Sequence, residues 1–246
     1  MRKTFVIDSL PESALRYRAG WAVVAIDVIR ATTMAVTAVS LGRKCYPVDT
    51  LDAAFRLAGT LHNPLLAGEI DGDMPEGFEM NNTPAGLARR SDISRPLVML
   101  SSSGTRLIVN AHGCDSIYLG CFRNAEALAD TLAEGLHPRI ALIGAGSRRQ
   151  FREEDQIGCA WIAARLAKAG YVADDERTTK VVERWGNARP SDCLISGSVD
   201  YLKRTGQTED LQFILDRIND LDETYVFDSG EVVIAPELEP AVYNIA

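Results

Sequence analysis

Residues 21–27 read WAVVAID, and the chain continues with VIRATTMAVTAVSLG over residues 28–42. The first segment is a nearly continuous apolar run rich in β-branched residues, which is typical of a strand covered on both faces. The second contains ATTMAVTAVSLG, which predicts a helix over residues 31–42 that ends at Gly42. A strand that leads directly into a helix indicates an α/β protein.

The same alternation of strand and helix recurs along the chain. Further strands are predicted at residues 4–8, 45–48, 64–69, 97–101, 117–120 and 139–145, and further helices at residues 50–61, 104–111, 124–135 and 153–170. Gly, Asp, Asn and Pro dominate residues 70–83, which therefore predict a long loop. We expect a three-layer α/β sandwich with a mostly parallel or mixed sheet and helices on both faces.

The pattern changes after about residue 174. Residues 174–220 are mostly polar and have helical periodicity. TYVFD (224–228) and EVVIA (231–235), separated by a Ser-Gly pair, predict an antiparallel hairpin, which we expect at an edge of the sheet. A length of 246 residues suits one large α/β unit, so we predict a single domain over residues 1–246.

Composition excludes several classes of partner. The chain has 26 Lys and Arg against 34 Asp and Glu, a net charge of −8, whereas a nucleic-acid-binding surface needs a basic field.

The sequence has no run of about 18 apolar residues that would predict a membrane span, and the first residues make a poor signal peptide. The five cysteines are odd in number and none are spaced as CxxC, which favours free thiols in a reducing compartment. We expect a cytoplasmic protein that binds neither nucleic acid nor membrane, and a homo-oligomer is compatible with the sequence.

Two predicted strand–helix junctions carry an arginine beside hydroxyl groups, where ligands of α/β sheets bind. These are DVIRATT at residues 27–33 and SSSGTR at residues 101–106. A helix N-terminus receives anions, and a guanidinium group matches phosphate or sulfonate. A cation at a helix N-terminus is unfavourable without an anion, which favours function for Arg30 and Arg106. Taken singly, the hydroxyls fit helix caps equally well.

Four carboxylates also follow predicted strands or begin a helix: Asp27, Glu69, Glu154 and Asp155. Oxygen ligands of this kind can hold a hard cation such as Mg²⁺. Simpler interpretations remain open at this point. Asp27 could form an ion pair with Arg30, Glu69 could be a solvated loop acid, and the acids of the last helix could be favourable first-turn charges.

Several familiar catalytic motifs do not occur in the sequence. GAGSRR at residues 144–149 lacks the third glycine of a dinucleotide-binding loop, and there is no P-loop, HExxH or GxSxG motif. The three histidines lie far apart in the sequence. What remains is anion binding by arginines together with carboxylates and a metal.

The junction motifs resemble those of one family, the 2-phosphosulfolactate phosphatases of coenzyme M biosynthesis. The resemblance covers about residues 21–220 and rests on DxxRATT at 27–33, GE and then GF and NNTP within 68–84, SSSGTR at 101–106, NA at 124–125, and GxxxxFxxED at 146–155. The chain departs from the family pattern at four positions: Asn81 for Gly, Ser103 for Asn, Cys121 for Ser and Gly158 for Cys.

The resemblance implies Mg²⁺-dependent hydrolysis of 2-phospho-3-sulfolactate to 3-sulfolactate and phosphate. We hypothesise catalytic roles for Asp27, Arg30, Arg106 and Glu154 and metal binding by Asp27, Glu69 and Asp155. We further hypothesise substrate binding by Thr32, Thr33, Asn82, Ser103, Gly104, Thr105 and Asn124. Arg30 and Arg106 are expected to face one cavity as a clamp for a small anionic phosphate ester. Whether Asp27 is a metal ligand or a nucleophile stays open.

Two other functions fit the same residues. One is a phosphatase of this fold that acts on another small phosphorylated acid. The other is a non-catalytic module that binds an anion or a nucleotide, although such a module has no use for several acids beside its arginines.

Overall fold

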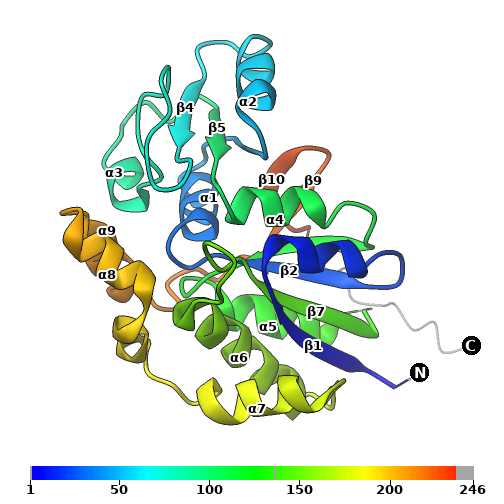
Figure 1. The fold of residues 1–246 in the computed structure, drawn as a ribbon. Coiled ribbons are helices and arrows are strands. Elements are labelled where there is room, and N and C mark those ends of the chain that lie inside the picture. Colours follow the sequence, from blue (N-terminus) through cyan, green and yellow to red (C-terminus); the bar gives the residue numbers. More distant parts are fainter. Residues whose placement is uncertain (1, 136, 237–246) are drawn as a thin grey trace, which may run out of the picture.

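The computed structural model describes residues 2–135 and 137–236 and has a three-layer α/β fold (Figure 1). Its ten strands form one mixed sheet in the order β4-β5-β3-β10-β9-β6-β2-β7-β1-β8. The strands are β1 (Thr4–Ser9), β2 (Ala22–Ile26), β3 (Cys45–Val48), β4 (Leu65–Gly68), β5 (Leu97–Leu100), β6 (Ser116–Gly120), β7 (Arg139–Gly144), β8 (Val172–Ala173), β9 (Tyr225–Asp228) and β10 (Glu231–Ile234). The predicted fold class is confirmed.

Most predicted helices appear within a few residues of their expected bounds. The helices are α1 (Ala31–Ser40), α2 (Leu51–Ala58), α3 (Pro84–Ala88), α4 (Gly104–Asn110), α5 (Ala125–Glu134), α6 (Glu153–Lys168), α7 (Glu176–Trp185), α8 (Gly197–Arg204) and α9 (Thr208–Leu215), with 3-10 turns η1 (Pro11–Arg16) and η2 (Pro190–Ile195). The sequence patterns did not predict η1, α3 or the two-residue strand β8. The single-domain prediction covers residues 1–246, of which residues 1, 136 and 237–246 lie outside the described part.

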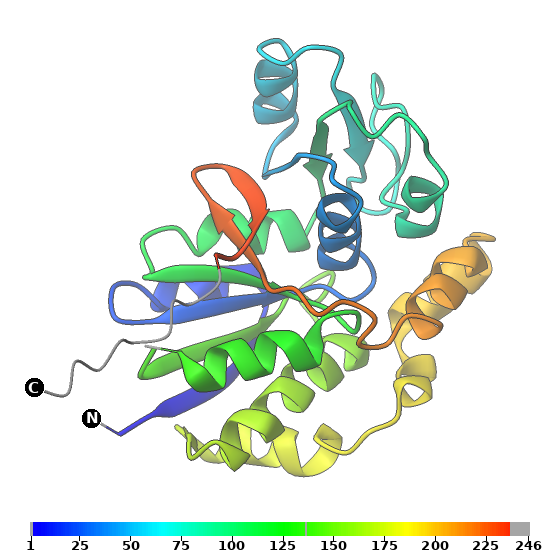
Figure 2. The same cartoon turned by 180° about the vertical axis from the view of Figure 1, so that it is seen from behind.

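The hairpin of β9 and β10 is where the structure differs most from expectation. It lies in the middle of the sheet, because β10 pairs with β3 and β9 pairs with β6, both antiparallel. Figure 2 shows the hairpin in orange and red between the two halves of the molecule. The edge position that we expected is therefore wrong. Alternation of apolar residues shows that a strand has a buried face, but it does not show whether both backbone edges are paired.

The hairpin separates two parallel groups of strands that run in opposite directions. Strands β4, β5 and β3 form the smaller group, and β6, β2, β7, β1 and β8 form the larger one. Each of the three antiparallel pairings at the hairpin reverses the strand direction once. In a flat sheet the carboxyl ends of the two groups would lie at opposite edges. Strand twist of roughly 20–25° per step accumulates along the sheet and turns one group across the other.

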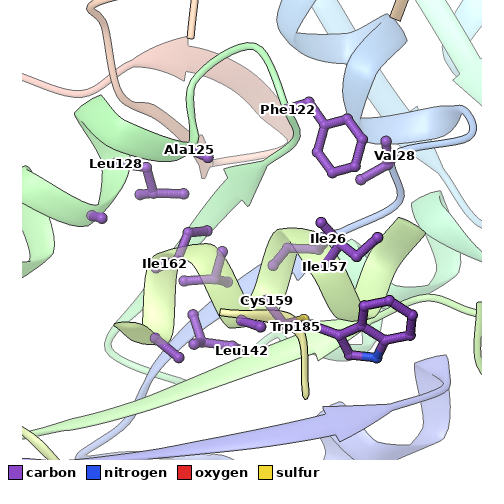
Figure 3. Packing of buried hydrophobic residues seen from close by; sticks show 14 of the residues in the cluster. Ile26, Val28, Phe122, Ala125, Leu128, Leu142, Ile157, Cys159, Ile162 and Trp185 are labelled. Carbon is purple, nitrogen blue, oxygen red and sulfur yellow. The ribbon is translucent and has the colours of Figure 1, made fainter. Parts of the chain in front are cut away.

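Both faces of the larger group are buried, as its apolar runs predict. Alternate residues of β2 pack in two different clusters: Val24 and Ile26 against the side of α5, α6 and α7, and Val23 and Ala25 against the side of α1, α4 and η1. Figure 3 shows the first cluster, in which Ile26 lies against Ile157 of α6. This packing places the β2 carboxyl end firmly between helices.

The structure also bears on the expectations about membrane spans and cysteines. No helix within the described ranges is long and apolar enough to cross a membrane. All five cysteines are free thiols, four of them buried.

Candidate active site

A cavity of about 260 Å³ lies where strand ends from both parallel groups meet. The loops after β2, β4, β5 and β7 contribute to its wall, and α8 closes one side. Its polar lining consists mainly of Asp27, Arg30, Glu69, Asp71, Asn82, Ser102, Ser103, Ser147, Arg148, Arg152, Ser198, Tyr201 and Arg204. The cavity is therefore lined by arginines, carboxylates and hydroxyl groups.

Asp27 follows β2 directly and lies at the cavity wall with 7% of its surface exposed. Its Oδ1 accepts a hydrogen bond from the Ala31 amide at 3.1 Å. Burial raises the pKa of Asp27 to about 7, and repulsion from Glu69 and Glu154 adds to this rise. The Ala31 amide and the charge of Arg30 oppose it. Asp27 can thus exchange a proton near neutral pH.

The two threonines after Arg30 hold the loop rather than face the cavity. Thr32 donates to the Gly120 carbonyl at 2.7 Å and accepts from the Asp27 amide at 2.9 Å, and Thr33 donates to the Val28 carbonyl at 2.8 Å. Both side chains are fully buried. Neither hydroxyl group lines the cavity, because backbone groups already use both.

Arg30 is buried and is held by helix α9. Its Nη1 donates to Asp210 Oδ2 and to Gln207 Oε1, both at 2.6 Å. Asp210 in turn accepts hydrogen bonds from the Thr83 hydroxyl at 2.8 Å and the Ala85 amide at 2.9 Å. The ion pair of Arg30 is therefore with Asp210 and not with Asp27. The Asp210 carboxylate joins the start of α1 to α3 and α9.

Arg106 lies outside the cavity, so the expectation that it faces the same cavity as Arg30 is wrong. Its side chain is 52% exposed and pairs with Glu12 at 3.1 Å. A Cβ on Gly104 would overlap the Asp27 carboxylate and Ala31, so the Gly104 face of α4 is the one that meets the site. Arg106 is two residues further along, and at about 100° per residue it lies on the opposite face of the helix.

Two other predicted substrate-binding residues stabilise loops. Thr105 and Ser101 exchange hydrogen bonds, with the Thr105 hydroxyl accepting from the Ser101 amide at 2.8 Å. The Asn124 side chain accepts from the Cys121 amide and donates to the Leu119 carbonyl, both at 3.0 Å. Thr105 and Asn124 are fully buried, so they shape the wall without lining it.

Three predicted residues from the smaller strand group do line the cavity: Glu69, Asn82 and Ser103. Glu69 accepts hydrogen bonds from the Ser102 amide at 2.8 Å and from the Gly72 amide at 2.6 Å. These bonds join the loops after β4 and β5. The Asn82 Oδ1 atom is buried and has no hydrogen-bond partner among the described residues.

Glu154 and Asp155 lie buried in the first turn of α6. Asp155 accepts from the Val28 and Gly146 amides, both at 2.9 Å, and so ties the loop after β2 to the loop after β7. Neither carboxylate oxygen of Glu154 has a hydrogen-bond partner within the described part of the chain. Burial raises the pKa of both groups. The Ser196 and Ser198 hydroxyls and the charge of Arg152 oppose the rise for Glu154, whereas repulsion from Glu154 and Asp27 raises the pKa of Asp155 further.

Metal binding was expected from Asp27, Glu69 and Asp155. Across residues 2–135 and 137–236, no three His, Cys, Asp or Glu side chains converge as a metal cluster. Mg²⁺ often binds through one or two carboxylates, waters and a substrate phosphate, so a closed cage is not required. Glu154 beside Asp27 is a buried carboxylate without a hydrogen-bond partner among the described residues, and such a group is costly unless it is protonated, a cation is bound nearby or the charge of Arg152 offsets it. The oxygen donors around Asp27 therefore fit a hard cation.

Sequence reasoning missed three arginines of the cavity wall: Arg148, Arg152 and Arg204. The first two belong to SRRQFR, which follows the predicted strand at residues 139–145, so their place at a strand end was a usable signal. Arg204 is in α8, where the sequence shows only a polar amphipathic helix. Only the packing of α8 beside the strand ends brings it to the site.

Comparison with known proteins identifies relatives of this chain. The sequence model of a family described as 2-phosphosulpholactate phosphatase matches residues 7–222. A protein of Carboxydothermus hydrogenoformans is 34% identical over 148 residues, which cover 60% of this chain and 61% of that protein. A protein of Symbiobacterium thermophilum is 32% identical over 88% of this chain and 95% of its own length, and one of Caldicellulosiruptor saccharolyticus is 31% identical over 78% and 83%. All three bear the name "Probable 2-phosphosulfolactate phosphatase".

The family match spans the cavity-lining residues from both strand groups and all of α8. The chain belongs to the 2-phosphosulpholactate phosphatase family.

Proposed function

We propose that this protein is a Mg²⁺-dependent phosphatase that hydrolyses 2-phospho-3-sulfolactate to 3-sulfolactate and phosphate, as in coenzyme M biosynthesis. Family membership and the names of the relatives support the substrate. One observation carries the chemistry: a single cavity combines arginines with an oxygen-only set of carboxylates. Phosphoryl transfer needs mainly positioning and neutralisation of charge, and these groups supply both.

Each part of the cavity has a task in this proposal. Arg30, which Asp210 holds in place, binds the phosphoryl oxygens through the guanidinium nitrogens that Asp210 and Gln207 do not occupy. Asp27 and Glu69 would hold Mg²⁺, with Glu154 as a further carboxylate behind Asp27. When bound, Mg²⁺ would neutralise charge on the phosphoryl oxygens.

Asp155 acts at a distance from the substrate. It fixes the backbone of the loops that carry Asp27 and the cavity arginines, because its two oxygens bind one amide from each loop. The hydroxyl groups of Ser102 and Ser103 complete the donor set on the opposite wall.

Phosphate release from a panel of phosphate monoesters tests the proposal. We expect 2-phospho-3-sulfolactate to be the preferred substrate, with turnover lost in EDTA and restored by Mg²⁺. Preference for a different phosphorylated acid would retain the phosphatase and reject this substrate. Binding of the same compounds without any phosphate release would instead favour the anion-binding module.

Asp27→Asn tests the carboxylate set. We expect turnover to fall by about a thousandfold, because the variant keeps the shape of the side chain and loses its charge. If Asp27 is a metal ligand, raising Mg²⁺ partly restores turnover; if it is a nucleophile, Mg²⁺ has no effect on the variant. Asp73→Asn is the matched control, since Asp73 is exposed and outside the cavity wall. Near-normal turnover of Asp27→Asn would reject both roles.

A further inference from the structure

Three arginines in the cavity wall form no ion pair with any described residue, although the charge of Arg152 lowers the pKa of the nearby Glu154. Arg148, Arg152 and Arg204 have no carboxylate oxygen within 4.0 Å among the described residues, whereas Arg30 pairs with Asp210 at 2.6 Å. A guanidinium group stays charged at any physiological pH. Several such groups at one cavity attract an anion between them.

Arg148 is held at the cavity by a tight turn. Ser147 and Gln150 exchange backbone hydrogen bonds of 2.8 and 3.0 Å around the pair Arg148 and Arg149. These two residues have φ values of 50° and 61°, a conformation that favours Asn and Gly. Non-glycine residues rarely adopt this conformation, and such residues cluster at functional sites. Arg148 lines the cavity and Arg149 does not.

Arg152 and Arg204 approach the cavity from two other positions. The Arg152 guanidinium lies against the start of α8, where a Cβ on Gly197 would be 3.7 Å from its Cζ atom. Its Nε atom is buried without a hydrogen-bond partner in the described ranges. Arg204 is the last residue of α8. Donors therefore reach the cavity from the turn, from the start of α6 and from α8.

The proposed substrate carries more anionic groups than Arg30 alone can bind. Besides its phosphoryl group it has a carboxylate and a sulfonate, and the sulfonate is always ionised and offers three oxygens. A planar carboxylate pairs best with one guanidinium group, whereas three oxygens in a tetrahedral arrangement suit donors from several directions. We propose that Arg148, Arg152 and Arg204 form a subsite for the sulfonate and thereby set substrate specificity. This inference rests on the proposed function.

Two substrates and two neighbouring arginines test the subsite. The measurement is kcat/KM for 2-phospho-3-sulfolactate and for 2-phospholactate, which lacks the sulfonate. We expect Arg148→Gln to lower the ratio of the two values at least tenfold. Arg149→Gln is the matched control, because it changes the same turn and the same φ region outside the cavity. It should leave the ratio unchanged. An equal loss on both substrates in Arg148→Gln would overturn the proposal.

Arg152→Gln and Arg204→Gln extend this test and should lower the ratio in the same direction. The melting temperature of each variant shows whether it is folded. If either variant is unfolded, Arg148→Gln and its control still decide the proposal.

Direct binding separates this inference from the proposed function. Titration calorimetry with 3-sulfolactate should show binding to the wild-type protein that is at least tenfold weaker in Arg148→Gln and unchanged in Arg149→Gln. If the wild-type protein hydrolyses neither substrate yet shows this difference, the proposed function fails and the anion subsite stands. Equal affinity in all three proteins would reject the subsite even if the phosphatase activity is found.

Discussion

The loops after β2 and β5 contain similar residues but place their arginines differently. Each loop has hydroxyl residues and an arginine at the start of a helix. Arg30 is buried beside Asp27 at the cavity, while Arg106 is half exposed and pairs with Glu12. A similar local motif thus puts one arginine in the site and the other on the surface.

The difference comes from which face of each helix meets the cavity. Arg30 precedes the first turn of α1, so its side chain can reach back to Asp210. In α4 the contact is made by Gly104, whose missing side chain allows close approach to Asp27. This contact turns Arg106 away. Residue type at a strand end therefore indicates a site, but helix rotation decides which side chain enters it.

Of the variants proposed here, the one that removes the Arg30 guanidinium group should lower kcat/KM the most, and it should separate the two loops most clearly. We expect Arg30→Gln to lower kcat/KM for the phosphate ester by about a thousandfold, because the phosphoryl oxygens lose a charged, bidentate donor. Arg106→Gln is the control and should stay within about twofold. Steady-state kinetics of the two variants checks this. Similar losses in both would mean that the two loops act alike.

Removal of the charge on Asp210 should act through Arg30. We expect Asp210→Asn to lower kcat/KM by about thirtyfold to a hundredfold, since Arg30 Nη1 then loses its charged partner. The double variant Arg30→Gln/Asp210→Asn should be no worse than Arg30→Gln alone. Glu209→Gln is the neighbouring control, because Glu209 forms an exposed ion pair with Arg89.

Fully additive losses would show that Asp210 has a separate structural role. Asp210→Glu keeps the charge and should recover part of the activity. The melting temperature of each variant shows whether the connection between α3 and α9 survives.

A methyl group at Gly104 should disturb the contact between the two loops. We expect Gly104→Ala to lower the free energy of unfolding by about 2 kcal/mol, because the new Cβ overlaps Asp27 and Ala31. Urea unfolding measures the change. Gly59→Ala is the control, since a Cβ there meets backbone atoms at an ordinary 3.5 Å, and its effect should stay within about 0.5 kcal/mol. Equal effects would show that α4 and the Asp27 loop are not closely packed.

The free energy of unfolding should also depend on pH through the Asp27 carboxyl group. Burial raises the pKa of Asp27 to about 7, so the folded chain keeps a proton that the unfolded chain releases near pH 4. Stability from this proton is present at low pH and is lost as the pH rises through about 7. Between pH 6 and pH 8, the metal-free protein should lose about 1 kcal/mol from this group.

Urea unfolding of metal-free wild-type protein and Asp27→Asn at both pH values measures this loss. Asp27→Asn should show a smaller loss, and Asp73→Asn should match the wild type. An identical pH dependence in wild type and Asp27→Asn would show that Asp27 is already ionised at pH 6.

Much of the fold could be predicted because its signals are local. The apolar run of β2 has a period that differs from that of the helix after it, and this contrast repeats with each later strand. The position of the β9–β10 hairpin could not be predicted in this way. Pairing of β10 with β3 and of β9 with β6 joins segments more than 100 residues apart, and no local pattern records such a pairing.

Part of the candidate site could also be predicted, because polar residues at strand ends are a local signal. Asp27, Arg30 and Glu69 stand at strand ends, and the structure puts all three at the cavity. Thr32 has a polar side chain at such an end as well, but the loop backbone uses its hydroxyl group. A hydroxyl that caps a loop and one that meets a ligand look identical in a sequence.

By itself, the sequence determined the α/β class, the strand ends as the place of the site, and the acidic and basic residue types found there. Only the tertiary structure decided that two oppositely directed strand groups bring their carboxyl ends to one cavity. The tertiary structure also decided that Asp210 binds Arg30 and that Arg204 lines the cavity, whereas Arg106 lies outside it and pairs with Glu12. The physical reason is that secondary structure follows from local periodicity, whereas sheet twist, helix rotation and the docking of α8 and α9 follow from contacts between distant segments.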